Sequence, residues 1–189
     1  MEQVASRNPH APPVAFSPME LAPAVPEDAL PIARVHVRSW QAAYASLLDP
    51  TWLAALSVAE RAERWARILA NRESEVFVSR QDQRVTGFVS LGPSRDPGAA
   101  ATQGEIWSLY AAPEVWGSGT GRALLGHALQ HLQASGFQSA SLWVLSGNER
   151  GIRFYERCGF SRVPGSENSF ELGGRQVQEA AYRRPALTP

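Results

Sequence analysis

Three glycines within five residues precede a predicted helix, and no other feature of this chain restricts its fold as much. The stretch VWGSGTGRALLGHAL (115–129) places Gly117, Gly119 and Gly121 directly before leucines at helical spacing. Glycine destabilises a helix, so these positions indicate a tight bend or the close approach of another molecule to the backbone. When such a turn follows a strand, its N–H groups and those of the first helical turn favour an anion, usually a phosphate.

Spacing separates the motifs that compete for this stretch. A Walker A loop needs a lysine after its last glycine, and His127 follows Gly126 here. A dinucleotide fingerprint needs G-x-G-x-x-G, and the third glycine is missing whether the motif starts at Gly117 or at Gly119. The pattern that remains is G-x-G-x-G after a strand. A turn without a ligand stays an alternative, although a turn alone does not need three glycines.

The composition predicts one globular domain and excludes several classes of function. The chain has 189 residues, 44% of them hydrophobic, and its 18 basic and 18 acidic residues cancel. A balanced charge gives no general attraction to nucleic acid or to anionic lipid. The single Cys158 cannot form an internal disulfide, and no segment approaches the ~20 apolar residues of a membrane span. We therefore expect a cytoplasmic protein that binds neither nucleic acid nor membrane.

Hydrophobic periodicity and turn residues predict a mixed α/β fold. Helices are expected at 25–48, at 57–71, from the glycines to Gly136, and at 148–160. Strands are expected at 14–21, 75–80, 84–92, 105–111, 139–145, 168–172 and 176–183. The helix after the glycines makes a βαβ crossover between two of these strands. We expect a disordered tail at 1–13, a domain at 14–183 and a short tail at 184–189.

Two motifs, in this order, resemble those of the GNAT superfamily of acetyl-CoA-dependent N-acetyltransferases. LYAAPEVWGSGTGRALL (109–125) is similar to the acetyl-CoA loop of that family, and NERGIRFYERCGF (148–160) is similar to its downstream motif. The order of elements is similar from about Phe16 to about Tyr182. The resemblance implies the GNAT fold, in which helices flank a central sheet with antiparallel and parallel pairs. Two strands of that sheet splay apart where acetyl-CoA binds.

The resemblance also implies which residues bind the co-substrate acetyl-CoA. The backbone of Leu109, Tyr110 and Ala111 would bind the pantetheine arm, together with Asn148. Trp116 stands where the family usually has Gln or Arg, so either Arg122 supplies the missing donor or the indole packs on the loop or on the adenine. The pyrophosphate would be held by backbone N–H groups of the turn: Gly117, Ser118, Gly119, Thr120, Gly121 and Arg122.

Acetyl transfer to an amine has three chemical needs. A base must remove a proton from an alkylammonium of pKa ~10, a donor must stabilise the oxyanion, and the leaving thiolate needs a proton. By resemblance Glu105 is the candidate base, with a chain of waters as the alternative. Tyr155 is the candidate acid, because it lies two turns after Asn148 on the same helix face. The backbone N–H near Tyr110 or Ala111 is the expected oxyanion donor.

Three aromatic residues, Trp40, Tyr44 and Trp52, surround the loop after the first helix, where GNAT proteins often form the acceptor wall. We expect an N-acetyltransferase that acts on a primary amine of an unidentified small molecule or peptide. A non-catalytic acyl-CoA sensor is the alternative, and a homodimer stays open. No metal site is expected, because His127 and His131 lack a third ligand at suitable spacing.

Overall fold

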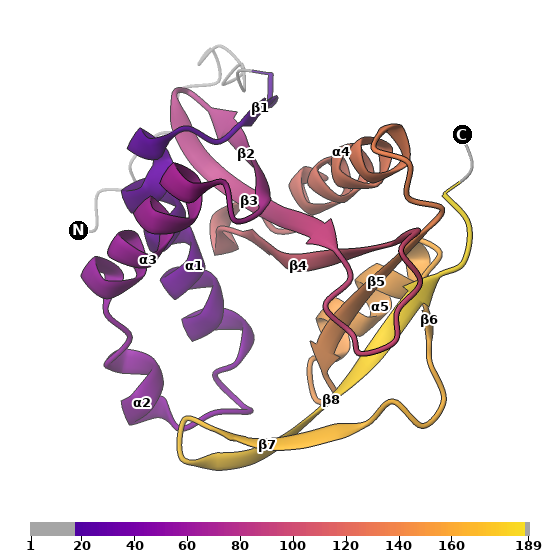
Figure 1. Cartoon of the computed structure of the whole chain (residues 1–189). Coiled ribbons are helices and arrows are strands. Elements are labelled where there is room, and N and C mark those ends of the chain that lie inside the picture. The colour runs from indigo at the N-terminus through magenta and orange to yellow at the C-terminus, as the bar shows by residue number, and fades with distance from the viewer. Residues whose placement is uncertain (1–17, 188–189) are drawn as a thin grey trace, which may run out of the picture.

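The computed structural model describes residues 18–187. Its sheet has eight strands within these residues, in the order β1-β2-β3-β4-β5-β8-β6, with β7 paired to β8 (Figure 1). The strands are β1 Glu20–Pro23, β2 Glu75–Gln81, β3 Arg84–Pro93, β4 Gln103–Ala111, β5 Ser139–Leu145, β6 Ser161–Arg162, β7 Asn168–Leu172 and β8 Arg175–Arg184. The helices are α1 Ala29–Ala43, α2 Pro50–Ala54, α3 Val58–Asn71, α4 Thr120–Ala134 and α5 Glu149–Arg157, with 3-10 turns η1 Pro26–Asp28 and η2 Pro113–Val115.

The predicted mixed α/β class is confirmed. Helix α4 joins β4 to β5, and these two strands form a parallel pair, whereas the other pairs within residues 18–187 are antiparallel. Local signals explain several helix ends. Ser57 accepts a hydrogen bond from the N–H of Glu60, as expected for an N-cap, and Gly159 ends α5 with φ 84°.

Two short elements, α2 and β6, were not expected. The predicted helix at 25–48 ends earlier, at Ala43, and α2 begins a few residues later. The Asp49 carboxylate accepts the N–H groups of Thr51 and Trp52, and Pro50 occupies the first helical position. A helix of five residues is too short to show a hydrophobic period, so only this cap marks it in the sequence.

The helices cover both faces of the sheet. Helices α1 and α3 lie on one face of β2 to β4, and α4 lies on the other (Figure 1). The first core contains Ile32, Trp65 and Phe88. The second contains Leu124 and Leu142. Each face of the central strands is therefore buried under a helix, as in other α/β sheets.

Strands β4 and β5 are paired only at one end. Their ladder runs from Gln103–Ser139 to Glu105–Ser141, and β4 then continues along β3 while β5 continues along β8. A bulge lies where β4 leaves β5, since Ser90 and Leu91 of β3 oppose Ser108 and Ile106 and leave Trp107 as the extra residue. Beyond this point, the facing edges of β4 and β5 are therefore not paired with each other.

The hairpin of β7 and β8 extends from the sheet toward α2 (Figure 1). A Cβ atom on Gly173, at the hairpin tip, would lie 2.7 Å from the Trp52 ring. Phe170 and Leu172 of this hairpin pack in a third core with Tyr44. The hairpin therefore closes one side of the space below β4 and β5.

The ends of the domain differ slightly from the expected bounds. The expected tail at 1–13 lies outside the described residues, as does the first part of the strand expected at 14–21. At the other end, the expected tail at 184–189 begins inside β8, and Leu187 is buried and donates its N–H to the Gln138 carbonyl at 2.9 Å. Within residues 18–187, no helix combines the length and apolar character needed to cross a bilayer.

Candidate active site

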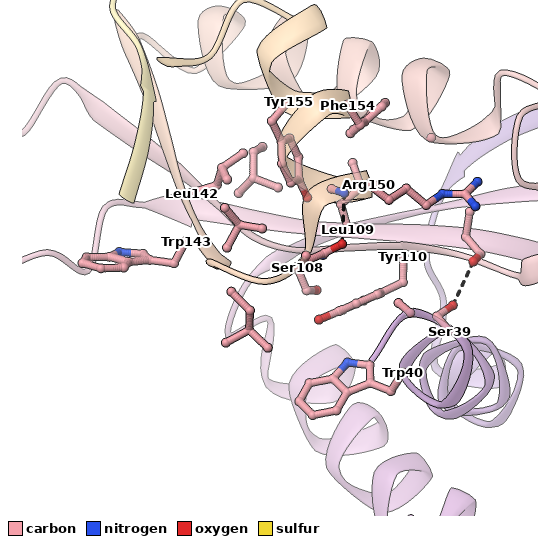
Figure 2. Close-up of a pocket in the computed structure, with 18 of the residues that line it drawn as sticks. Ser39, Trp40, Ser108, Leu109, Tyr110, Leu142, Trp143, Arg150, Phe154 and Tyr155 are labelled. Carbon is pink, nitrogen blue, oxygen red and sulfur yellow. Dashed lines mark hydrogen bonds between the residues drawn. The ribbon is translucent and has the colours of Figure 1, made fainter. Parts of the chain in front are cut away.

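A cavity of about 760 Å³ opens where β4 and β5 separate. Figure 2 shows Arg150, Phe154 and Tyr155 of α5 on one side of β4, and Trp40 of α1 on the other side. Residues of the glycine turn, β5 and the β7–β8 hairpin complete the lining. The cavity thus connects the two faces of the sheet through the gap between two strands.

The glycine turn presents its backbone to open space. Gly117 and Gly119 have φ of 82° and 96°, and no atom lies within 4 Å of the position that a Cβ would take on either of them. Helix α4 begins at Thr120 without any side-chain cap, so its first N–H groups remain for another acceptor. The geometry is that of an anion site at a helix N-terminus.

The hydroxyl groups of this turn bond within the loop. Ser118 Oγ donates to the Val115 carbonyl at 2.8 Å and lies 2.9 Å from Thr120 Oγ1. Neither residue lines the cavity, and the Thr120 side chain is buried. Of these two residues, only backbone groups are therefore available to a ligand.

Trp116 packs on the loop and supports an arginine. Its Nε1 donates to the Ala111 carbonyl at 2.7 Å, and the Arg150 guanidinium lies 4.0 Å from the centre of its ring. Arg122 of α4 and Arg157 of α5 line the same end of the cavity. Arg150 was not predicted from the sequence, because its contact with Trp116 joins residues 34 positions apart.

Asn148 and Tyr155 both line the cavity, as predicted for residues on one face of α5. Asn148 Oδ1 caps the helix by accepting the Gly151 N–H at 3.0 Å. Tyr155 extends from α5 toward β4 (Figure 2). Burial raises the pKa of Tyr155 well above its ordinary value, and the neighbouring Tyr110 and Cys158 add to this shift. The Tyr155 hydroxyl is therefore protonated across the neutral pH range.

Tyr110 lies on the opposite face of β4 in an aromatic cluster. Its ring stacks on His36 with the ring centres 4.9 Å apart, and Trp65 Nε1 donates to His36 Nδ1 at 3.3 Å. Burial, with smaller effects from nearby arginines, lowers the pKa of His36 to about 3. Burial also raises the pKa of Tyr44, and the adjacent Tyr110 hydroxyl raises it further. These groups are uncharged at neutral pH.

The structure does not place the Glu105 carboxylate on the cavity wall. Glu105 is 1% exposed and is absent from the lining residues. Its Oε2 accepts the Arg95 backbone N–H at 2.7 Å, and its Oε1 accepts both Nε, at 3.1 Å, and Nη2 of the same arginine. Arg95 itself lines the cavity and lies over the Trp107 ring. The role of Glu105 as the base stays a prediction, and so does the chain of waters.

On the side of α1, where the sequence predicts the acceptor wall, Trp40 and Tyr44 line the cavity, whereas Trp52 packs against Gly173. The other lining residues on this side come from β5 and from the β7–β8 hairpin and were not predicted from the sequence: Trp143, Leu145, Phe170, Leu172 and Glu179. The alternation of side chains along 139–145 and 176–183 predicts that each strand has two different faces. It does not predict which of the two faces lines the cavity.

The two histidines of α4 have a packing role. His127 and His131 lie edge-on to Phe77, with ring centres 4.5 and 4.9 Å away. Throughout residues 18–187, no three His, Cys, Asp or Glu side chains gather in a way that could hold a metal ion.

Comparison with known proteins identifies the family. Residues 38–160 match the profile of the acetyltransferase (GNAT) family. The chain belongs to the GNAT acetyltransferase family. It is 34% identical over 165 residues to YuaI of Bacillus subtilis, described as an uncharacterized N-acetyltransferase, and the match covers 86% of this chain and 90% of YuaI. GNAT membership makes the protein an acetyl-CoA-dependent acyltransferase.

The chain is also similar to a second curated protein in sequence and to a solved structure in fold. It is 32% identical over 165 residues to a mycothiol acetyltransferase of Frankia alni, covering 76% of this chain and 47% of that enzyme, so it spans about half of that relative. A solved structure, the PaiA N-acetyltransferase of Thermoplasma acidophilum in complex with coenzyme A, superposes with a TM-score of 0.66 at 22% identity. That superposition covers 86% of this chain and 98% of PaiA and supports the shared fold.

Proposed function

We propose that this GNAT protein transfers the acetyl group of acetyl-CoA to the primary amine of a small molecule or peptide. The observation that carries this proposal is the single cavity that joins the glycine turn to the opposite face of the sheet between β4 and β5. An acyl donor and an acceptor that enter from opposite faces would meet in this gap.

The residues present fit acetyl-CoA at one end of the cavity. Backbone N–H groups from Gly117 to Arg122 would hold the pyrophosphate, and the guanidinium of Arg150, which lies over the Trp116 ring, would add positive charge there. The Ala111 carbonyl already accepts Ser39 Oγ at 2.8 Å and Trp116 Nε1. The Tyr110 carbonyl points toward Gly87 of β3, so the pantetheine amides would bond mainly to the backbone of Leu109.

The chemistry requires one bond to form and one to break. The amine nitrogen, once deprotonated, forms a C–N bond to the acetyl carbon, and the C–S bond breaks. Tyr155 is protonated at neutral pH because burial raises its pKa, and it would give its hydroxyl proton to the departing thiolate. The second proton, which leaves the nitrogen as the amide forms, would then restore the Tyr155 hydroxyl through solvent. A backbone N–H near Tyr110 or Ala111 would stabilise the oxyanion. The ammonium proton goes to a base, for which Glu105, directly or through water, is the candidate.

The alternative function, a sensor that binds acyl-CoA without turnover, makes a different prediction in one assay. We expect the purified protein to release free coenzyme A when acetyl-CoA is mixed with members of a panel of amines. Tight binding of coenzyme A with no release above the hydrolysis background for any amine would favour the sensor. We also propose that the protein is located in the cytoplasm. A measurement of its mass in solution decides whether it forms a homodimer.

A further inference from the structure

Glu179 is the only acidic residue among the described residues that line the cavity. It lies on β8, in register with Leu145 of β5 and with Asn168 of β7. Alternate residues of β8 point in opposite directions, and Ala180 and Tyr182 pack in the core against α4. Glu179 therefore points to the other face of the sheet, where the predicted acceptor wall lies.

The surroundings of Glu179 are apolar. The same end of the cavity is formed by Trp143, Leu145, Phe170 and Leu172. Within residues 18–187 no arginine or histidine forms an ion pair with the Glu179 carboxylate, whose Oε1 accepts a long hydrogen bond, 3.4 Å, from Asn168 Nδ2. Burial raises the pKa of Glu179. A carboxylate in such a place is stabilised when a cation comes beside it.

Charge is distributed unevenly along the cavity. Arg122, Arg150 and Arg157 come from α4 and α5, at the end with the glycine turn. Arg95 lines the other part, but its guanidinium is held by the buried Glu105 carboxylate. The acceptor end therefore offers one carboxylate and no cation that is free of a carboxylate partner among the described lining residues.

We propose that the Glu179 carboxylate forms an ion pair with the ammonium group of the acceptor, and that acceptors are small amines with an apolar body and no carboxylate. This inference rests on the proposed function, since it names the substrate class of the same cavity. The apolar wall would remove the body of the amine from water. An amino acid would bring a second charge for which this end has no free partner.

The first experiment measures binding without turnover. 2-Phenylethylamine and 3-methylbutylamine carry an ammonium on an apolar body, and phenylalanine adds a carboxylate to the first of these. Each is titrated into the protein saturated with coenzyme A, using NMR or calorimetry. We expect the two amines to bind and phenylalanine to bind at least about 10-fold more weakly, since an unpaired buried charge is costly.

Two variants form a matched pair for this measurement. Glu179→Gln removes the charge that faces the cavity, and Glu171→Gln removes the same charge from the exposed face of β7, away from the lining residues. We expect Glu179→Gln to weaken amine binding by roughly 10- to 100-fold, the usual range for losing a charged partner. Glu171→Gln should bind as the wild type does. Both variants should keep the wild-type affinity for coenzyme A and its melting temperature.

Steady-state kinetics with acetyl-CoA gives the second readout. The loss in Glu179→Gln should lie mainly in the KM for the amine, because an ion pair made in the ground state is removed. Unchanged amine affinity and unchanged KM in Glu179→Gln would overturn the inference, as would a preference for phenylalanine over 2-phenylethylamine, or the absence of binding by both amines. If the amines bind through Glu179 but no coenzyme A is released, the inference stands and the proposed transferase function fails.

Discussion

Packing does not require glycine at position 119, but its backbone conformation does, and so does the proposed approach of a phosphate. Its φ is 96°, and the site of a Cβ meets no atom within 4 Å. A β-branched residue there is strained by about 1–2 kcal/mol, and its side chain would fill the space above the turn. We therefore expect Gly119→Val to lose binding of acetyl-CoA, with at least a 100-fold weaker Kd by calorimetry, while the protein still folds.

The control for this variant is Gly126→Val. Gly126 lies within α4, has no positive φ and likewise meets no atom at the Cβ position. It should bind acetyl-CoA as the wild type does. Equal affinity in both variants would contradict the anion site at the glycine turn.

The ion pair of Glu105 with Arg95 allows its base role to be tested separately from its structural role. If Glu105 removes the ammonium proton, Glu105→Gln lowers kcat/KM by roughly 10²–10⁴-fold, and the loss shrinks as the pH approaches the pKa of the amine. Arg95→Met breaks the same ion pair but keeps the carboxylate. We expect Arg95→Met to lose far less, measured as pH profiles of kcat/KM. Equal losses in both variants, without recovery at high pH, would assign Glu105 a structural role only.

At the level of a whole helix, the Asn148 side chain caps the start of α5 and is also the proposed contact to the pantetheine arm. The Asn148 amide folds over Gly151, and a Cβ atom on Gly151 would lie 2.6 Å from Asn148 Nδ2. Alanine favours a helix over glycine by about 1 kcal/mol, yet here it displaces the cap. We expect Gly151→Ala to raise the KM for acetyl-CoA several-fold.

Gly126→Ala, on α4, has open space at the same point and should only stabilise its helix. Melting temperature and the KM for acetyl-CoA are measured for both variants. A Gly151→Ala variant with an unchanged KM would show that the Asn148 side chain does not contact the bound pantetheine.

Across the whole molecule, His36 joins the helical layer to the sheet. It lies between Trp65 of α3 and Tyr110 of β4, and its pKa is lowered from 6.5 to about 3, first by burial and then by Arg61 and Arg64. Because protonation is easier in the unfolded chain, this contribution to stability is complete above about pH 6.5 and is lost as the pH falls toward 3.

Below about pH 6.5 we therefore expect the free energy of unfolding to fall by up to about 1.4 kcal/mol per pH unit from this residue. His36→Asn removes the titrating group while keeping an acceptor for Trp65. It should be less stable at pH 8 but should lose less stability on going to pH 4.5. Urea unfolding of both proteins at pH 8, 6.5, 5.5 and 4.5 measures the difference. If the free energy of unfolding changed with pH by the same amount in both proteins, His36 would not titrate as its burial implies.

Features that depend on a few adjacent residues were predictable from the sequence. The glycine turn, the Asn148 cap, the Gly159 helix end and the crossover from β4 to β5 are encoded by backbone preferences and by spacing along one segment. Such signals act over one or two helical turns, so they do not depend on the rest of the fold. The anion site and the family resemblance both rest on features of this kind.

The proposed acceptor end of the cavity could not be predicted in this way, because its residues are brought together by the pairing of segments that are distant in the sequence. Glu105 lies near the start of β4, as expected, but its carboxylate accepts hydrogen bonds from Arg95 of the preceding loop. Glu179 looks in the sequence like any polar residue of an alternating strand. It reaches the cavity because β8 pairs with β5 in one register, and a shift by one residue would turn it to the opposite face. Register is set by the packing of the whole sheet, so only the folded chain shows which carboxylate lines the cavity.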